Sequence, residues 1–86
     1  MILQTNDDET IIICAVRYAL PRQSYMPSLI ADWLRDNWQS LNALNQNTIL
    51  RDIKDAIDRK ECGSELVDLP MWTRLLDDLT NIKKVN

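Results

Sequence analysis

The side chains of this chain that could do acid–base or metal chemistry are carboxylates, because the sequence contains no histidine. The absence of histidine removes the commonest general base, the commonest metal ligand and every Ser-His or Cys-His nucleophile. Acidic pairs at helical spacing remain at Asp32/Asp36 and Asp52/Asp55, but such pairs on a helix surface are usually solvated. We therefore expect no catalytic residue, no cofactor and no metal site, and hence a protein that is not an enzyme.

Glycine and cysteine usage argues against two further kinds of site. The chain has one glycine, so it cannot form a glycine-rich phosphate-binding loop. Its two cysteines follow no metal or redox spacing. Cys14 lies in the apolar run 11–16 and is predicted to be a buried thiol, whereas Cys62 precedes Gly63 at an expected helix end. Two free thiols in a reducing cytoplasm are the favoured interpretation, with one disulfide as the alternative.

The charge distribution argues against nucleic-acid and membrane partners. Thirteen acidic and ten basic residues give a net charge of −3, and no segment concentrates the basic ones, as a nucleic-acid-binding face requires. The longest apolar run is six residues and ends at Arg17, which is too short to span a membrane. No basic segment leads an apolar run, so we expect no signal peptide and a cytoplasmic location.

Residue types that are enriched at binding surfaces gather between residues 17 and 28. This segment contains both tyrosines of the chain, two of its three prolines and two arginines. Arginine and tyrosine combine a large contact area with directional hydrogen bonds. The candidate partner-binding residues are Arg17, Tyr18, Arg22, Tyr25, Ser28, Asp32 and Arg35. In the alternative interpretation the tyrosines pack at the edge of the core, and the arginines pair with Asp32 or Asp36 or cap carbonyl groups.

The elements that must position these residues are predicted to be four helices. Apolar spacing and capping residues indicate helices over about 7–20, 25–38, 46–61 and 69–82, within a single domain 1–86. The first helix is apolar almost all round, which is typical of a helix enclosed by others. The predicted fold is an all-α, compact single-domain bundle of four short helices with a central, largely buried first helix.

Local signals set the expected helix ends. Asn6 is the predicted N-cap of the first helix, with Glu9 closing a capping box. Pro21 removes a backbone donor and is expected to end that helix. Asn45 is the predicted cap of the third helix and Gly63 its terminating residue.

The tryptophans are predicted to serve mainly in the core. Trp33 shares an apolar stripe with Leu29, and Trp72 lies on the stripe of the last helix, so both are expected to be buried. Trp38 lies off the centre of its stripe. It is expected either to cover one edge of the core or to be partly exposed at a contact surface.

Part of the chain resembles a group of small helical proteins of phages and mobile elements. The resemblance is carried by Arg17-Tyr18-Ala19-Leu20, Arg22, Ser24-Tyr25-Met26 and Asp32-Trp33-Leu34, and further on by Arg51-Asp52-Ile53, Ala56-Ile57 and Trp72. In that group a "RYALGRxTY" segment precedes a helix. Here Pro21 stands where the group tends to have glycine, and proline cannot adopt a left-handed turn. The resemblance implies an accessory protein that binds host or phage proteins.

We therefore expect a non-enzymatic protein-binding accessory protein in the cytoplasm of a bacterial host. Its most specific form is an inhibitor of a host defence complex such as a CRISPR effector, that is, an anti-CRISPR protein. Two alternatives stay open. One is a small DNA-binding transcriptional regulator, although the outer face of the third helix is nearly neutral in charge. The other is a virion assembly component that forms a homo-oligomer through an apolar patch around Trp38.

Overall fold

Four α-helices and a short 3-10 helix account for most of the described residues. The structure is a computed structural model that describes residues 4–22 and 26–85, with side chains described for 9–22 and 27–82. The elements are α1 (Gln4–Ala19), α2 (Met26–Asn37), η1 (Trp38–Ser40), α3 (Ala43–Arg59) and α4 (Asp68–Val85). Within the described ranges there is no strand. The predicted all-α bundle of four helices is confirmed.

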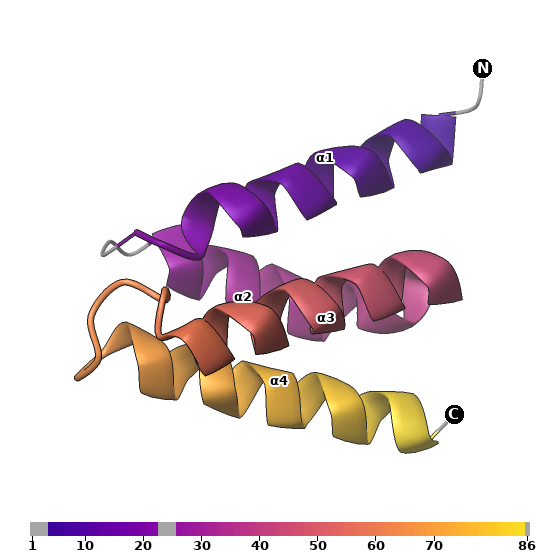
Figure 1. The fold of residues 1–86 in the computed structure, drawn as a ribbon. Coiled ribbons are helices and arrows are strands. Elements are labelled where there is room, and N and C mark those ends of the chain that lie inside the picture. The colour runs from indigo at the N-terminus through magenta and orange to yellow at the C-terminus, as the bar shows by residue number, and fades with distance from the viewer. Residues whose placement is uncertain (1–3, 23–25, 86) are drawn as a thin grey trace.

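In the view of Figure 1, α1 runs along one side of the bundle and α4 along the opposite side. Helix α1 packs against both α2 and α3, and α4 also packs against both of them. The predicted central, largely buried position of the first helix is wrong, because α1 packs against the same two helices as α4 and several of its described side chains are exposed. Val16 and Ala19 of α1 enter the core, but Ile11 and Cys14 are exposed. The apolar residues all round α1 do not mean that it is enclosed, because one of its apolar faces meets water.

The core is centred on two tryptophans. Trp38 is 1% exposed and Trp72 is 0% exposed, which confirms the prediction for Trp72 and places Trp38 inside the bundle. Trp33, which was also predicted to be buried, is instead 40% exposed. The buried row of this part of the chain is Ala31, Leu34 and Trp38, at spacing i, i+3, i+7. Trp33 belongs to the neighbouring row on the helix surface, so packing the first row leaves it at the rim.

Both ends of α3 differ from the sequence prediction. Asn42, rather than Asn45, is the N-cap, and its side chain accepts a hydrogen bond from the Leu44 N–H at 2.8 Å. At the other end Lys60 adopts the left-handed conformation with φ 58°, so the helix ends before Gly63.

Gly63 and Glu9 also have roles that differ from those predicted. Gly63, at φ +67°, packs on the turn after α1, where a Cβ atom would lie 2.6 Å from the Arg22 carbonyl oxygen. Because α1 begins at Gln4, Asn6 lies inside the helix and is not its N-cap. Glu9 is consequently more than one turn from the helix start. It forms its hydrogen bonds with residues near the start of α3.

Candidate partner-binding groove

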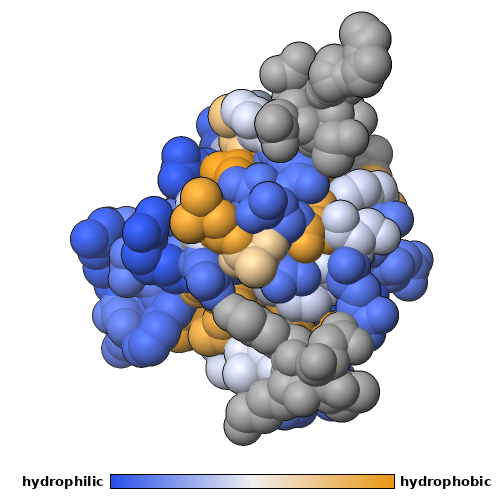
Figure 2. Space-filling view, turned by 90° about the vertical axis from the view of Figure 1, so that its right-hand side faces the viewer, coloured by the Kyte–Doolittle hydropathy of each residue, from blue (hydrophilic) through white to orange (hydrophobic). Residues whose placement is uncertain are grey.

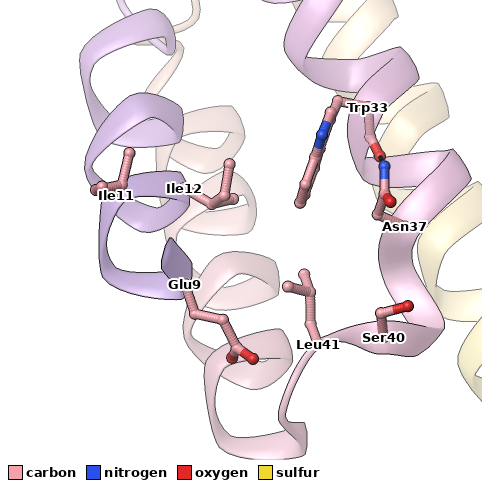
Figure 3. A pocket seen from close by; sticks show the side chains of 7 residues that line it. All are labelled: Glu9, Ile11, Ile12, Trp33, Asn37, Ser40 and Leu41. Atoms are coloured by element: carbon pink, nitrogen blue, oxygen red, sulfur yellow. Dashed lines mark hydrogen bonds between the residues drawn. The ribbon is translucent and has the colours of Figure 1, made fainter. Parts of the chain in front are cut away.

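A pocket of about 370 Å³ opens between α1 and α2, beside the connection that leads into α3 (Figure 3). It is lined by side chains of α1, α2 and that connection, namely Glu9, Ile11, Ile12, Trp33, Asn37, Ser40 and Leu41. Ile12 and Trp33 face each other from the two helices, and Leu41 lies below them. Most of the lining surface is apolar. We call this pocket, together with the helix surfaces that border it, the α1–α2 groove.

The turn between the two helices sets this arrangement. Leu20 donates its N–H to the Val16 carbonyl and Arg22 donates its N–H to the Ala19 carbonyl, both at 2.9 Å. Pro21 cannot continue the helix, so the chain reverses here. Helix α2 then returns alongside α1 (Figure 1). The reversal brings the face of α1 that carries Ile11 and Ile12 next to the face of α2 that carries Trp33.

Large apolar side chains remain in contact with water along this groove. Ile11 is 62% exposed and Trp33 is 40% exposed at the pocket itself. Along the same two helices, Tyr18 of α1 is 56% exposed and Leu29 of α2 is 55% exposed. Seen from the end of the bundle that carries the α2–α3 connection, apolar side chains also reach the surface among polar ones (Figure 2). Such gatherings on small proteins commonly mark interaction sites.

Glu9 places a carboxylate at one end of the pocket. The residue is 6% exposed. Its Oε1 atom accepts hydrogen bonds from the Asn42 backbone N–H at 3.1 Å and from the Asn45 side-chain amide at 2.5 Å. These donors lie at the N-terminal end of α3, where the helix dipole favours a negative charge. Glu9 is the one charged residue among those that line the pocket.

Two of the sequence-predicted site residues are engaged within the fold near the end of α1. The Arg17 Nε atom lies 2.6 Å from a carboxylate oxygen of Asp52, so this ion pair ties α1 to α3. The Arg22 guanidinium donates to the Tyr18 carbonyl and lies 3.5 Å from the centroid of the Tyr18 ring. Arg22 therefore caps a backbone carbonyl group, as expected if the arginines support the fold instead of binding a partner. Arg17 pairs with an acid of α3, rather than with Asp32 or Asp36.

The remaining predicted residues lie on or near α2. Arg35 contacts Asp78 of α4 at 3.0 Å and Asp32 at 3.5 Å, so it points toward α4. Ser28 and Asp32 are exposed, and Tyr25 lies outside the described residues. The described members of the predicted set therefore make separate contacts with α3, with α4 and within the end of α1, and none of them lines the pocket. Their role in binding a partner stays a prediction.

The prediction missed the residues that do converge. The sequence pattern predicts core or helix-cap positions for Ile11, Ile12, Trp33 and Glu9, because each fits an apolar stripe or a capping pattern. One signal was present in the sequence. A helix that is apolar all round cannot be covered on every side by only three other helices, so part of its apolar surface has to face water.

Other classes of site find no support among the described residues. No group of three or more acidic or cysteine side chains there is arranged to hold a metal ion. Within the same ranges no helix has both the length and the apolar character needed to cross a membrane. Both cysteines are free, as expected, but Cys14 is exposed and not buried as predicted. Cys14 follows Ile11 by three residues and so lies on the same outward face of α1.

Comparisons with protein-family models, curated proteins and solved structures found no match for this chain.

Proposed function

We propose that this chain is a non-enzymatic protein-binding module that holds its partner in the α1–α2 groove. The observation that carries the proposal is the position of Trp33, which is 40% exposed at the pocket while Trp38 and Trp72 are at most 1% exposed. Tryptophan is among the residues most enriched at binding hot spots, because it removes a large apolar area from water when a partner covers it. Covering Trp33 and Ile11 supplies the hydrophobic part of the binding free energy.

The shape of the groove favours a helical or extended segment of a protein as its occupant. Two neighbouring helices form its walls, and an amphipathic helix can lie between them with side chains at i, i+3 and i+4 directed inward. The pocket of about 370 Å³ lies at the lower end of the roughly 300–1,000 Å³ range of small-molecule sites. It is large enough for one or two bulky side chains of the partner.

The more specific form of the proposal is an accessory protein of a phage or mobile element that inhibits a host defence complex such as a CRISPR effector. It derives from the resemblance of the segment around Arg17-Tyr18-Ala19-Leu20 to such proteins. A non-enzymatic inhibitor acts by occupying a surface that its target needs. The exposed apolar groove is the feature of this chain best suited to that task.

The two alternative functions receive less support. A DNA-binding regulator would use basic residues on the exposed face of α3, but Lys54 is paired with Asp58 at 3.1 Å on that face. A virion assembly component that associates through Trp38 receives little support, because Trp38 is 1% exposed and offers almost no surface to a second copy. Self-association through the α1–α2 groove would be a different arrangement, and sedimentation measurements would reveal it.

Capture of the partner with matched variants tests the proposal. Tagged protein is used for affinity purification from a bacterial host, followed by mass spectrometry of the bound proteins. We expect Trp33→Gln to remove the partner that the unmodified chain captures, with the helical circular dichroism unchanged.

The matched control is Leu66→Gln. Leu66 is 89% exposed in the loop before α4, at the end of the bundle away from the α2–α3 connection (Figure 1). This control also replaces an exposed apolar side chain, and it should still capture the partner. Equal capture by both variants would overturn the assignment of the groove.

A further inference from the structure

We infer that the α1–α2 groove accepts an arginine side chain of the partner, with its guanidinium group on Glu9 and its methylene stem between Ile12, Trp33 and Leu41. This inference rests on the proposed function, because it names the chemical group that the partner inserts. The proposed occupant is a cationic side chain of the partner. An uncharged apolar side chain is the alternative that the experiment below distinguishes.

The charges around the pocket favour a cation. Glu9 is an acid, and the other lining residues carry no charge. Asp36 follows Trp33 by three residues, so it lies on the neighbouring part of the α2 surface, and it is exposed. Arg35, the basic residue nearest to Trp33 in sequence, contacts Asp78 of α4 at 3.0 Å. A positive side chain entering the groove therefore meets acids and no lining base, which gives it electrostatic complementarity.

The geometry of Glu9 leaves room for a new donor. An ionised carboxylate has about four acceptor positions on its two oxygens. The two hydrogen bonds described for Glu9 both end on Oε1, which leaves Oε2 for a guanidinium N–H. The carboxylate points from α1 toward Leu41 and the lower part of the pocket (Figure 3). Since Glu9 is 6% exposed, an ion pair formed there is shielded from water and is stronger than one on an open surface.

The apolar walls fit the rest of an arginine side chain. Ile12 and Leu41 offer aliphatic surface to the methylene stem. The Trp33 ring projects into the same space (Figure 3), and arginine stacks on tryptophan faces through a cation–π interaction. Arginine suits this combination better than lysine, because its planar group can both stack and donate in a bidentate manner.

A titration with a small probe tests this chemistry without knowledge of the partner. The probe is N-acetyl-arginine methylamide, and its matched control is the citrulline analogue, which has nearly the same shape without the charge. Binding is followed by NMR through the indole N–H of Trp33 and the methyl groups of Ile11 and Ile12, with the buried Trp38 and Trp72 indoles as internal references. We expect the arginine probe to bind about tenfold more tightly than citrulline, as a charge-assisted contact predicts. Added salt should weaken it.

Two variants show whether binding depends on the Glu9 carboxylate or only on the negative net charge of the protein. Glu9→Gln keeps an oxygen acceptor for Asn42 and Asn45 and should lower the affinity for the arginine probe about tenfold. Asp77→Asn removes an exposed acid of α4 that does not line the pocket and should leave the affinity unchanged. The amide spectrum of each variant reports whether it is folded.

Equal binding of arginine and citrulline, or full binding by Glu9→Gln, would show that the pocket is only an apolar site and would overturn the inference. An unchanged Trp33 indole signal with both probes would overturn it as well. These outcomes differ from failure of the proposed function. Partner capture that is lost in Trp33→Gln while the arginine probe does not bind would leave the protein-binding function standing and remove the arginine. If the arginine probe binds but partner capture does not depend on Trp33, the arginine site would stand and the protein-binding function of the groove would be removed.

Discussion

The Glu9 carboxylate accepts a hydrogen bond of 2.5 Å from the side-chain amide of Asn45, and this contact joins the middle of α1 to the first turn of α3. The same oxygen accepts the backbone N–H of Asn42, the N-cap of α3. One carboxylate therefore holds both the N-cap residue and the first turn of α3 in place and forms one end of the pocket. Structural support and candidate binding chemistry meet at this residue.

Removing the Glu9 carboxylate should destabilise the fold. In Glu9→Ala the Asn42 N–H and the Asn45 amide lose their acceptor in a partly buried place, so we expect a loss of about 1–3 kcal/mol in the free energy of unfolding. Glu9→Gln retains an acceptor and should lose less than half of that. Urea unfolding followed by circular dichroism measures both. A Glu9→Ala variant as stable as the unmodified chain would contradict the supporting role of this carboxylate.

Substitutions at the two positive-φ residues should act in opposite directions. Gly63→Ala would place a Cβ atom 2.6 Å from the Arg22 carbonyl oxygen at φ +67°, and we expect it to cost about 1–3 kcal/mol of stability. Lys60 already carries a side chain at φ 58°, so Lys60→Gly should raise stability by up to about 1 kcal/mol. Thermal unfolding compares the two variants. Destabilisation of similar size by both would argue against backbone conformation as the cause.

The two thiols should differ sharply in reactivity. Cys14 is exposed and Cys62 is buried. Burial is the main cause that raises the pKa of the Cys62 thiol to about 11, and the charges of Asp68 and Glu61 raise it further. At about pH 8 iodoacetamide should therefore modify Cys14 in the folded protein and leave Cys62 intact, because alkylation requires an accessible thiolate. Mass spectrometry of the peptides measures the two sites. Rapid alkylation of Cys62 without unfolding would contradict its burial.

The raised pKa of the Cys62 thiol also predicts how the stability of the fold depends on pH in the alkaline range. The unfolded chain releases the Cys62 proton near pH 9.0, whereas the folded chain keeps it up to a pKa of about 11. Between these values the unfolded state binds fewer protons than the folded state, so stability should fall as the pH rises through this window. Cys62→Ala removes this contribution and should flatten the decline. A decline of the same slope in the variant would assign it to other groups.

A double substitution in the last turn of α1 and in the turn after it should leave the fold and the groove intact. Arg17→Ala removes an ion pair whose arginine side chain is 54% exposed, and exposed pairs contribute at most about 1 kcal/mol. Combined with Arg22→Glu it should retain helical circular dichroism and partner capture, because neither residue lines the pocket between α1 and α2. Pull-down beside Trp33→Gln checks this. Loss of capture in the double variant alone would move the site to the predicted set around Tyr18.

The number and order of the helices were predictable because their signals are local. The apolar spacing of 46–61 and the helix-breaking Pro21 depend on few neighbours. Local signals could not predict whether Trp33 or Trp38 would be buried in the core. Both lie on apolar rows of the same segment, and only packing against the other helices selects the row that contains Ala31, Leu34 and Trp38.

Dependence on residues that are distant in the sequence also explains the wrong predictions for the helix caps and for the site. Asn42 and Asn45 are both good capping residues by type, and Asn42 serves because Leu41, just before it, packs against the core and fixes where the helix begins. Glu9 looked like a capping-box acid because its partners lie more than thirty positions away in the chain. The groove was hidden for the same reason, since its two walls come from different helices.

The outer position of α1 has a consequence for local unfolding. Trp38 follows α2 and Trp72 belongs to α4, whereas α1 and the residue after it add Val16, Ala19 and Leu20 to this core. Detaching α1 alone therefore exposes less apolar surface than global unfolding, and its backbone amides should exchange with deuterium faster than those of α3. A partner seated between α1 and α2 binds only the docked form, so it would clamp α1 in place and slow that exchange in proportion to its occupancy.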